Sequence, residues 1–300
     1  MVDFNAESKN KYPKVLLTGG TGQVGGELLM ALKPFGWIWA PSRKEFDLAA
    51  PESMRIKIEQ FQPDLIVNPA AYTTVDLAES EVKLAYAINV TAPKVLAQEA
   101  NRLGIPLIHY STDYVFDGRK REPYSEEDEP CPLNVYGRTK LEGEKAVQTA
   151  HDCSLIFRTS WVYSTRGKNF FTTMQRLFRE QSLVKVVDDQ VGAPTSAHFL
   201  AETTAHVLGQ LKGCKAENRW GIYHMTASGE TSWFGFSNQI YSLLNRKKEV
   251  DIVPVATEDF PVIAKRPHYS LLNQEKLCNQ FGVEIADWKS QLVELVREES

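Results

Sequence analysis

Short apolar segments alternate with amphipathic segments along the first half of the chain. The apolar runs show no polar alternation, which is typical of strands buried on both faces; they span 15–17, 37–40, 64–68, 105–110 and 154–158. The segments between them have helical periodicity and span 27–32, 51–61, 84–103 and a stretch from residue 136. This order predicts an α/β fold with a doubly wound parallel sheet of the Rossmann type, whose carboxyl edge carries the functional site.

The pattern changes after residue 165. Helices are expected at 169–179, 198–211, 233–244, 273–280 and 286–297, with short strands within 184–195 and at 221–225. We therefore expect a dinucleotide-binding Rossmann domain over 1–165, completed by 197–226. A smaller mixed α/β region, 166–196 and 227–300, would form a substrate-binding domain.

A glycine-rich turn, TGGTGQVGG at 18–26, joins the first strand to the first helix. Gly19 permits the tight turn, Gly22 lets the backbone approach a pyrophosphate, and Gly25 allows close packing of helix on strand. The amino terminus of the helix adds N–H donors and the positive end of its dipole. The turn predicts a dinucleotide site whose contacts come from Gly19, Gly22, Gln23, Val24 and Gly25.

The end of the second strand bears on which dinucleotide binds. An NAD site usually has an acidic residue there for the ribose 2′-hydroxyl, whereas this chain has Ser42 and Arg43. These two residues favour NADP(H), with NAD(H) as the second option, although Arg43 could equally be a surface charge. Asp47 and Leu48 follow at the expected place for the adenine. The small or flat residues Ala70, Ala71 and Tyr72 leave room for the cofactor to cross the sheet edge.

Tyr136 and Lys140 are four residues apart in a segment that is predicted to be helical, so they share one face. A nearby ammonium group lowers the pKa of a phenol, and a tyrosine so tuned can exchange a proton with a carbonyl or hydroxyl oxygen near neutral pH. Ser111 and Thr112 end the fourth strand, where a hydroxyl can donate a hydrogen bond to a substrate carbonyl. The pattern indicates carbonyl reduction or its reverse.

Composition narrows the partners and the location. The 300-residue chain has a net charge of −4 and no Lys or Arg run longer than three, so we expect neither nucleic acid nor a membrane as a partner. The polar start and the lack of an 18-residue apolar window predict a cytoplasmic protein. The cysteines lie far apart without a Cys-x-x-Cys pair, which argues against a zinc site or disulfides and favours a reducing compartment; they are Cys131, Cys153, Cys214 and Cys278.

Together these motifs resemble the extended short-chain dehydrogenase/reductases, and within them the dTDP-4-dehydrorhamnose reductase family. The matching segments are 19–25, 68–76, 111–118, 189–195 and the Arg-Pro pair at 266–267. The stretch DQVGAPT at 189–195 is the more specific of them. The resemblance spans essentially the whole chain.

The resemblance implies reduction of dTDP-4-dehydro-6-deoxy-L-mannose to dTDP-L-rhamnose with NADPH or NADH, a step toward cell-wall polysaccharide. Hydride would pass to the sugar C4 carbon while Tyr136 protonates the oxygen and Thr112 hydrogen-bonds it. Lys140 would lower the tyrosine pKa and hold the nicotinamide ribose. The implied substrate-binding residues are Ser111, Thr112, Asp113, Trp161, Asn169 and Arg266.

Three of these substrate residues have competing interpretations. Trp161 could be a core tryptophan at a strand end, Asn169 a helix cap, and Arg266 half of a surface ion pair. The chain also departs from the family at His198, which replaces a glutamate linked to a magnesium-bridged dimer, so no metal is expected. His268 and Tyr269 replace the usual residues after the Arg-Pro pair, and His268 is expected to be a packed loop residue rather than a catalytic one.

Three other functions compete with a sugar-nucleotide reductase. A sugar-nucleotide dehydratase needs an Asp-Glu pair after the threonine, and here Asp113 and Tyr114 follow Thr112, so we reject it. A nucleotide-sugar 4-epimerase with tightly bound NAD shares the Tyr/Lys pair, and Ser42 and Arg43 weaken it. An NADP-binding regulatory subunit would have no need of the complete catalytic set. The sequence leaves open whether the chain forms a homodimer.

Overall fold

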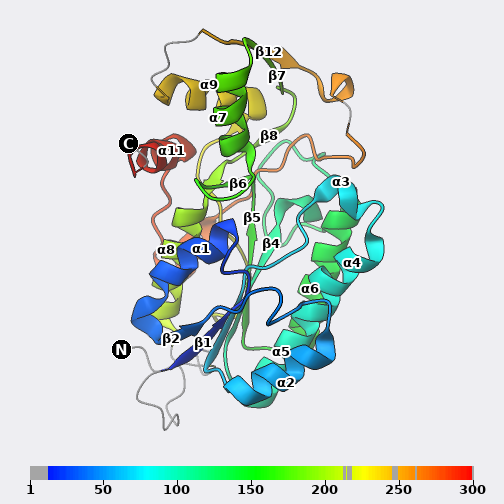
Figure 1. Cartoon of the computed structure of the whole chain (residues 1–300), viewed down its shortest axis with the longest axis vertical. Helices are drawn as coiled ribbons and strands as arrows, with labels where there is room; N and C mark the ends of the chain where they lie inside the picture. Colours follow the sequence, from blue (N-terminus) through cyan, green and yellow to red (C-terminus); the bar gives the residue numbers. More distant parts are fainter. Residues whose placement is uncertain (1–12, 212–213, 215–217, 245–248, 261, 299–300) are drawn as a thin grey trace.

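A six-stranded parallel sheet forms the centre of the molecule (Figure 1). The computed structural model describes residues 13–211, 214, 218–244, 249–260 and 262–298; the polar segment 1–12 lies outside this part. The strands are ordered β10-β5-β4-β3-β1-β2 and every neighbouring pair is parallel. Their bounds are β1 Lys14–Leu17, β2 Trp37–Trp39, β3 Leu65–Asn68, β4 Leu107–Thr112, β5 Ser154–Thr159 and β10 Gly221–His224. The predicted doubly wound α/β fold is confirmed.

Helices cover both faces of this sheet (Figure 1). On one face lie α1 (Gln23–Ala31) and α8 (Ala197–Gln210). The other face carries α2 (Pro51–Phe61), α5 (Ala92–Leu103) and α6 (Val135–Ala150). Each strand is therefore buried on both sides, which explains the apolar runs without polar alternation.

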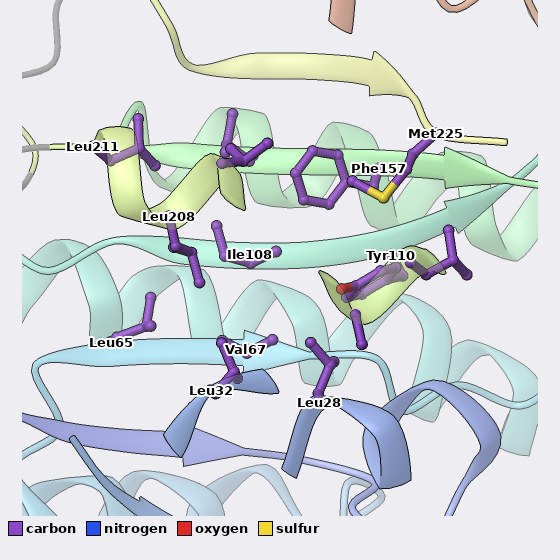
Figure 2. Close-up of a cluster of buried hydrophobic side chains, with 14 of the residues drawn as sticks. Leu28, Leu32, Leu65, Val67, Ile108, Tyr110, Phe157, Leu208, Leu211 and Met225 are labelled. Carbon is purple, nitrogen blue, oxygen red and sulfur yellow. The ribbon is translucent and has the colours of Figure 1, made fainter. Parts of the chain in front are cut away.

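Successive strand residues enter opposite cores. Val15 and Leu17 join the core under α1 and α8, whereas Leu16 joins the core under α2 and α5. In the first core, the side chains of β3, β4 and β5 meet α1 and α8 (Figure 2); the labelled ones are Leu28, Leu32, Leu65, Val67, Ile108, Tyr110, Phe157, Leu208, Leu211 and Met225.

The long amphipathic helix expected over 84–103 is three consecutive pieces. It starts as α4 (Val82–Tyr86), passes through the single π-helical turn η2 (Ala87–Thr91) and continues as α5. The π turn lies against α6: a Cβ on Gly143 would come within 2.1 Å of the Asn89 carbonyl oxygen. Glycine at 143 therefore lets these two helices approach closely. The short helices η1 (Lys33–Phe35), α3 (Val75–Ala78) and η3 (Asp113–Val115) complete this half.

A third core, rich in aromatic side chains, lies beyond the carboxyl edge of the sheet (Figure 1). It joins α7 (Phe170–Glu180), α9 (Trp233–Leu243) and α11 (Trp288–Glu298). The parallel pair β7 (Leu183–Val187) and β12 (Asp251–Val255) packs against α9, and the sequence pattern had assigned no element to 251–255. The remaining short elements are β6 Val162–Tyr163, β8 Val191–Gly192, β9 Thr195–Ser196, β11 Thr231–Ser232, η5 Thr257–Asp259 and α10 Glu275–Phe281.

No helix in the described part of the chain has both the length and the apolarity to cross a membrane.

A buried ion pair fastens α6 to the sheet. Arg158 of β5 donates from Nε and Nη2 to the two carboxylate oxygens of Glu144, at 3.0 and 2.7 Å. The two side chains are only 3% and 1% exposed. Such a two-pronged contact fixes geometry as well as energy, and removing one partner of a buried pair typically costs about 3–5 kcal/mol.

The expectation of no disulfide was wrong. Cys153, at the start of β5, is bonded to Cys214, beyond the end of α8, with their Cα atoms 5.3 Å apart. The two residues are 61 positions apart in sequence, but β10, which follows Cys214, pairs with β5. The inference of a reducing compartment loses this support. Among the described residues, His151 and these two cysteines form the only group with metal-ligand spacing, and both sulfurs are in the disulfide.

We predict that Cys153→Ser lowers the free energy of unfolding of the oxidised protein by about 4 kcal/mol, because the bond closes a loop of this length in the unfolded chain. Urea unfolding with and without dithiothreitol measures the effect. Reduction should bring the wild type to the level of the variant, while the matched change Cys131→Ser, at an exposed free cysteine, has no effect. A wild type that is indifferent to dithiothreitol would contradict the prediction.

Candidate active site

Two adjoining cavities open at the carboxyl edge of the sheet, beside the point where the chain order reverses between β1 and β3. The larger has a volume of about 420 Å³ and the smaller about 190 Å³. Gly19, Thr21, Ala70 and Ala71 line both. A reversal of strand order is where doubly wound sheets bind ligands, and the two connected cavities suit an extended molecule such as a dinucleotide.

The glycine turn has the geometry that its sequence predicts. Gly19 has a φ of +62°, in the left-handed region that favours glycine. A Cβ on Gly25 would lie 2.1 Å from the Gly19 carbonyl oxygen, so α1 can pack on the turn only with glycine there. Gly22 caps α1 without a side-chain hydrogen bond, and Gln23 and Val24 line the larger cavity. The first amides of α1 thus fit an anionic pyrophosphate.

The smaller cavity contains Arg43, Asp47 and Leu48 beside Phe46. The Arg43 guanidinium has no hydrogen bond or ion pair with the described residues, so its charge is available. Ser42 differs from the expectation, since its amide and hydroxyl both donate to the Glu45 carboxylate, at 2.8 and 2.7 Å. Ser42 can therefore bind a 2′-phosphate only if Glu45 moves away.

Tyr136, Lys140 and Ser111 line the larger cavity together, as their positions predicted. Asn134 caps α6 by accepting a hydrogen bond from the amide of Gly137 at 2.8 Å, which places Tyr136 in the first turn of the helix. The buried Lys140 Nζ donates to the backbone carbonyl of Tyr110 at 2.6 Å. Burial lowers the Lys140 pKa to about 8.

Lys140 was expected to lower the pKa of Tyr136, and the structure does not show this effect. Burial raises the pKa of Tyr136 to about 12, and a hydrogen bond with Thr112 offsets only part of that increase. The phenol therefore stays protonated near neutral pH. The lysine is directed to the Tyr110 carbonyl instead, because a buried ammonium group needs an acceptor close by.

The end of β4 places three polar side chains under the cavity. The Ser111 hydroxyl is buried and has no hydrogen-bond partner among the described residues, so it can donate to a ligand. Thr112 Oγ1 lies 3.0 Å from the Asp113 carboxylate, to which it donates. Burial raises the Asp113 pKa to about 6, although hydrogen bonds from Ser270 and Thr112 oppose the change.

Asn89 supports the site from behind, and the sequence analysis assigned it no role. Its side chain accepts from the Tyr72 amide at 2.8 Å and donates to the Tyr72 carbonyl at 3.1 Å. The Asn89 side-chain amide also donates to the hydroxyl of Thr139 in α6 at 3.0 Å. Asn89 therefore joins the loop after β3 to the helix that carries Tyr136. The signal in the sequence was a single asparagine on an otherwise apolar helix face.

Trp161 stands in a left-handed conformation, φ +46°, that is uncommon for a bulky residue. Its ring stacks on Trp233, with centroids 3.5 Å apart and planes 4° from parallel. A Cβ on Gly192 would be 2.5 Å from the Trp161 ring, which explains the glycine within the DQVGAPT motif. The tryptophan is only partly buried and lines neither of the two cavities.

Two other proposed substrate residues already have partners within the protein. Asn169 caps α7 through Thr172 and donates from Nδ2 to the Ser164 carbonyl at 2.8 Å, so helix capping accounts for its side chain. Arg266 is paired with Asp76, at 2.9 Å, and is only 20% exposed.

The two histidines that depart from the family pattern lie apart from Tyr136 and its cavity. His198 Nδ1 is 3.7 Å from the Glu27 carboxylate. The expectation that His268 is packed was wrong, because its side chain is 62% exposed and hydrogen-bonds to the Asp189 carbonyl.

Asp113→Asn should make stability less sensitive to pH. The folded chain binds the Asp113 proton more tightly than the unfolded chain, since the pKa is raised from 3.8 to about 6. Its contribution to stability is thus present below pH 4 and lost as the pH rises through 6, by about 3 kcal/mol. Urea unfolding at pH 4 and pH 7.5 should show this loss in the wild type but not in the variant. A control, Asp259→Asn at an exposed site, should behave as wild type, and equal pH dependence in all three would contradict the prediction.

Comparison with known proteins places these features in a family. The family model described as the RmlD substrate binding domain matches residues 13–300. A dTDP-4-dehydrorhamnose reductase of Burkholderia thailandensis is 45% identical over 284 residues, which cover 92% of this chain and 95% of that protein. The reductase of Escherichia coli K12 is 43% identical, with 92% and 94% covered.

Solved structures agree. A dTDP-4-dehydrorhamnose reductase from Bacillus anthracis, crystallised in complex with NADP, has a TM-score of 0.89 at 35% identity, covering 96% of this chain and 99% of that one. A UDP-glucose 4-epimerase of Thermus thermophilus, in complex with NAD, has a TM-score of 0.75 at 16% identity over 96% of this chain and 100% of that one, which shows a shared fold alone. The chain therefore belongs to the RmlD substrate binding domain family, in agreement with the resemblance of its motifs to the dTDP-4-dehydrorhamnose reductases.

Proposed function

We propose that the protein reduces the C4 ketone of dTDP-4-dehydro-6-deoxy-L-mannose to give dTDP-L-rhamnose, with NAD(P)H as the hydride donor. The observation that carries the proposal is one cavity lined by the glycine turn at one end and by Ser111, Tyr136 and Lys140 at the other. Such a cavity would bring a bound dinucleotide next to a proton donor. The reductases at 43–45% identity over most of the chain support the same activity.

The chain's own residues perform the proton transfer and the positioning. The bound nicotinamide supplies the hydride to the carbonyl carbon. Tyr136, protonated because of its raised pKa, gives its proton to the ketone oxygen, so that the ketone becomes an alcohol. Thr112 hydrogen-bonds the phenol and orients it, whereas the Lys140 ammonium is bonded to the Tyr110 carbonyl. Lys140 also holds the nicotinamide ribose in this proposal.

The cofactor preference follows from the smaller cavity. Its unpaired Arg43 suits a 2′-phosphate, and NADP is the molecule found in the Bacillus anthracis structure. NAD(H) is the second option, because Glu45 could accept hydrogen bonds from a ribose without the phosphate. Residues 1–165 with 197–226 would bind the dinucleotide, and 166–196 with 227–300 the sugar nucleotide.

The epimerase and regulatory-subunit alternatives have weaker support. The epimerases share the fold at 16–17% identity, whereas reductases match at far higher identity. The catalytic set is complete, which a subunit without activity would not need. A cytoplasmic location and a homodimer remain predictions.

The test of this function is NADPH oxidation, followed by absorbance, with enzymatically made dTDP-4-dehydrorhamnose. We expect turnover by the wild type and a loss of at least about 100-fold in kcat for Tyr136→Phe, which removes only the transferable proton. NADPH affinity of the variant, measured by fluorescence, should be nearly unchanged. Wild-type inactivity would refute the function, and full activity of the variant would exclude Tyr136 as the acid. Stoichiometric NAD in the purified protein would favour the epimerase.

Arg43→Ala should raise the KM for NADPH about 10-fold and leave the KM for NADH within twofold, because only NADPH carries the charged 2′-phosphate. Steady-state kinetics with both cofactors check this. Lys44→Ala, at the neighbouring exposed lysine, is the matched control and should change neither value. Equal effects of Arg43→Ala on both cofactors would remove Arg43 from phosphate recognition.

A further inference from the structure

Three groups that can ligate a metal ion meet at the amino edge of the central sheet, at the end opposite the two cavities. They are a ring nitrogen of His151 and the sulfurs of Cys153 and Cys214. All three atoms lie within 4.8 Å of one another. The disulfide between the two cysteines therefore has a histidine directly beside it, and this histidine has no part in the site at the carboxyl edge.

The main chain holds two of these residues in place. The His151 amide donates to the Val147 carbonyl at 3.0 Å, at the end of α6. The Cys153 carbonyl accepts from the Leu107 amide of β4 at 3.1 Å. The side chains of His151 and Cys153 are buried, whereas Cys214, between α8 and β10, is half-buried. Two of the groups are thus fixed by α6 and the sheet, and the third closes the cluster from the side nearer to solvent.

The hydrogen bond of His151 leaves one ring nitrogen ready to bind a cation. Its Nε2 lies 2.8 Å from the Ile105 carbonyl oxygen. A carbonyl can only accept, so Nε2 carries the proton, and burial disfavours a second proton on the ring. Nδ1 therefore keeps its lone pair. A metal-bound histidine typically donates its other ring N–H to a carbonyl in this way, which fixes both the tautomer and the orientation of the ring.

The redox state of the two sulfurs decides whether a metal can bind. A dithiol reductant supplies two electrons and two protons, which convert the S–S bond into two thiols, while the dithiol itself becomes a disulfide. Two thiolates and one neutral imidazole are ligands that zinc prefers, with a water in the fourth position. Zn²⁺ displaces both thiol protons into water, and its complex with two thiolates has no net charge, which suits a buried place.

We propose that reduction of the disulfide creates a zinc site, whose ligands are His151, Cys153 and Cys214. The end of α6, the start of β5 and the connection from α8 to β10 would then be held together by the disulfide in the oxidised protein and by the metal in the reduced protein. The site is independent of the proposed reductase activity. The competing explanation is a disulfide that lies beside a histidine by chance, and its reduced thiols would bind zinc no better than other cysteines.

Zinc binding by the full-length protein tests the proposal. The wild type is reduced with a phosphine, freed of metal and titrated with Zn²⁺ in competition with a coloured chelator. We expect one equivalent of zinc per chain after reduction and none while the disulfide is intact. Co²⁺ in place of Zn²⁺ should give the thiolate charge-transfer absorption and the intense visible bands of a tetrahedral site. Saturating zinc should raise the thermal midpoint of the reduced protein by about 5 °C.

Two variants separate a metal ligand from a neighbour of the disulfide. Cys214→Ser, at the half-buried position, should weaken zinc binding by the reduced protein at least about 100-fold. His151→Asn keeps an N–H for the Ile105 carbonyl and leaves both cysteines in place. It should form the disulfide normally on oxidation, yet lose zinc affinity by a similar factor after reduction. Cys131→Ser, at an exposed free cysteine, is the matched control and should bind zinc as the wild type does.

The absence of zinc binding by the reduced wild type, or equal binding before and after reduction, would overturn the proposal. Wild-type affinity in Cys214→Ser or in His151→Asn would overturn it as well. A loss of affinity in Cys131→Ser would place the metal elsewhere in the chain and would have the same consequence.

Discussion

The attachment of α6 to the sheet is the constraint on which the site depends. Two buried cations hold it: Lys140 reaches the Tyr110 carbonyl in β4, and Glu144 of the helix pairs with Arg158 in β5. Charges that are removed from water are stable only with partners in good geometry, so the helix has little freedom to slide or rotate. Because Tyr136 is in the first turn of this helix, the same contacts hold its phenol at the sheet edge.

Close backbone approaches around α6 and α1 determine the shape of the cavity. Gly143 lets the π turn at Asn89 reach α6, and Gly25 lets α1 rest on the turn at Gly19. Asn89 then joins the loop after β3 to α6. Larger side chains at these glycines would push α1 and α6 away from the backbone segments that they contact. The end of the cavity at the glycine turn is thus defined mainly by contacts too close for a Cβ.

The second half of the chain shapes the site in a different way, through contacts between residues that are far apart in sequence. The Trp161–Trp233 stack is possible because Gly192 leaves space for the ring. The loop 262–266 is held to α3 and to the start of α6 by Asp76 and Asn134. The position of the loop 262–266 therefore depends on the same helix that carries Tyr136.

The sequence by itself determined the sheet, the helix order, the glycine turn and the sharing of one cavity by Tyr136 and Lys140. These features follow from local periodicity and from short spacings, which do not depend on contacts with distant parts of the chain. Only the tertiary structure decided which partners the polar groups take: Lys140 turns to a carbonyl, Ser42 to Glu45, Asn169 to its own helix, and Cys153 to Cys214. Such partners, like the burial that raises the Tyr136 pKa, are set by neighbours that folding brings together and that local sequence does not encode.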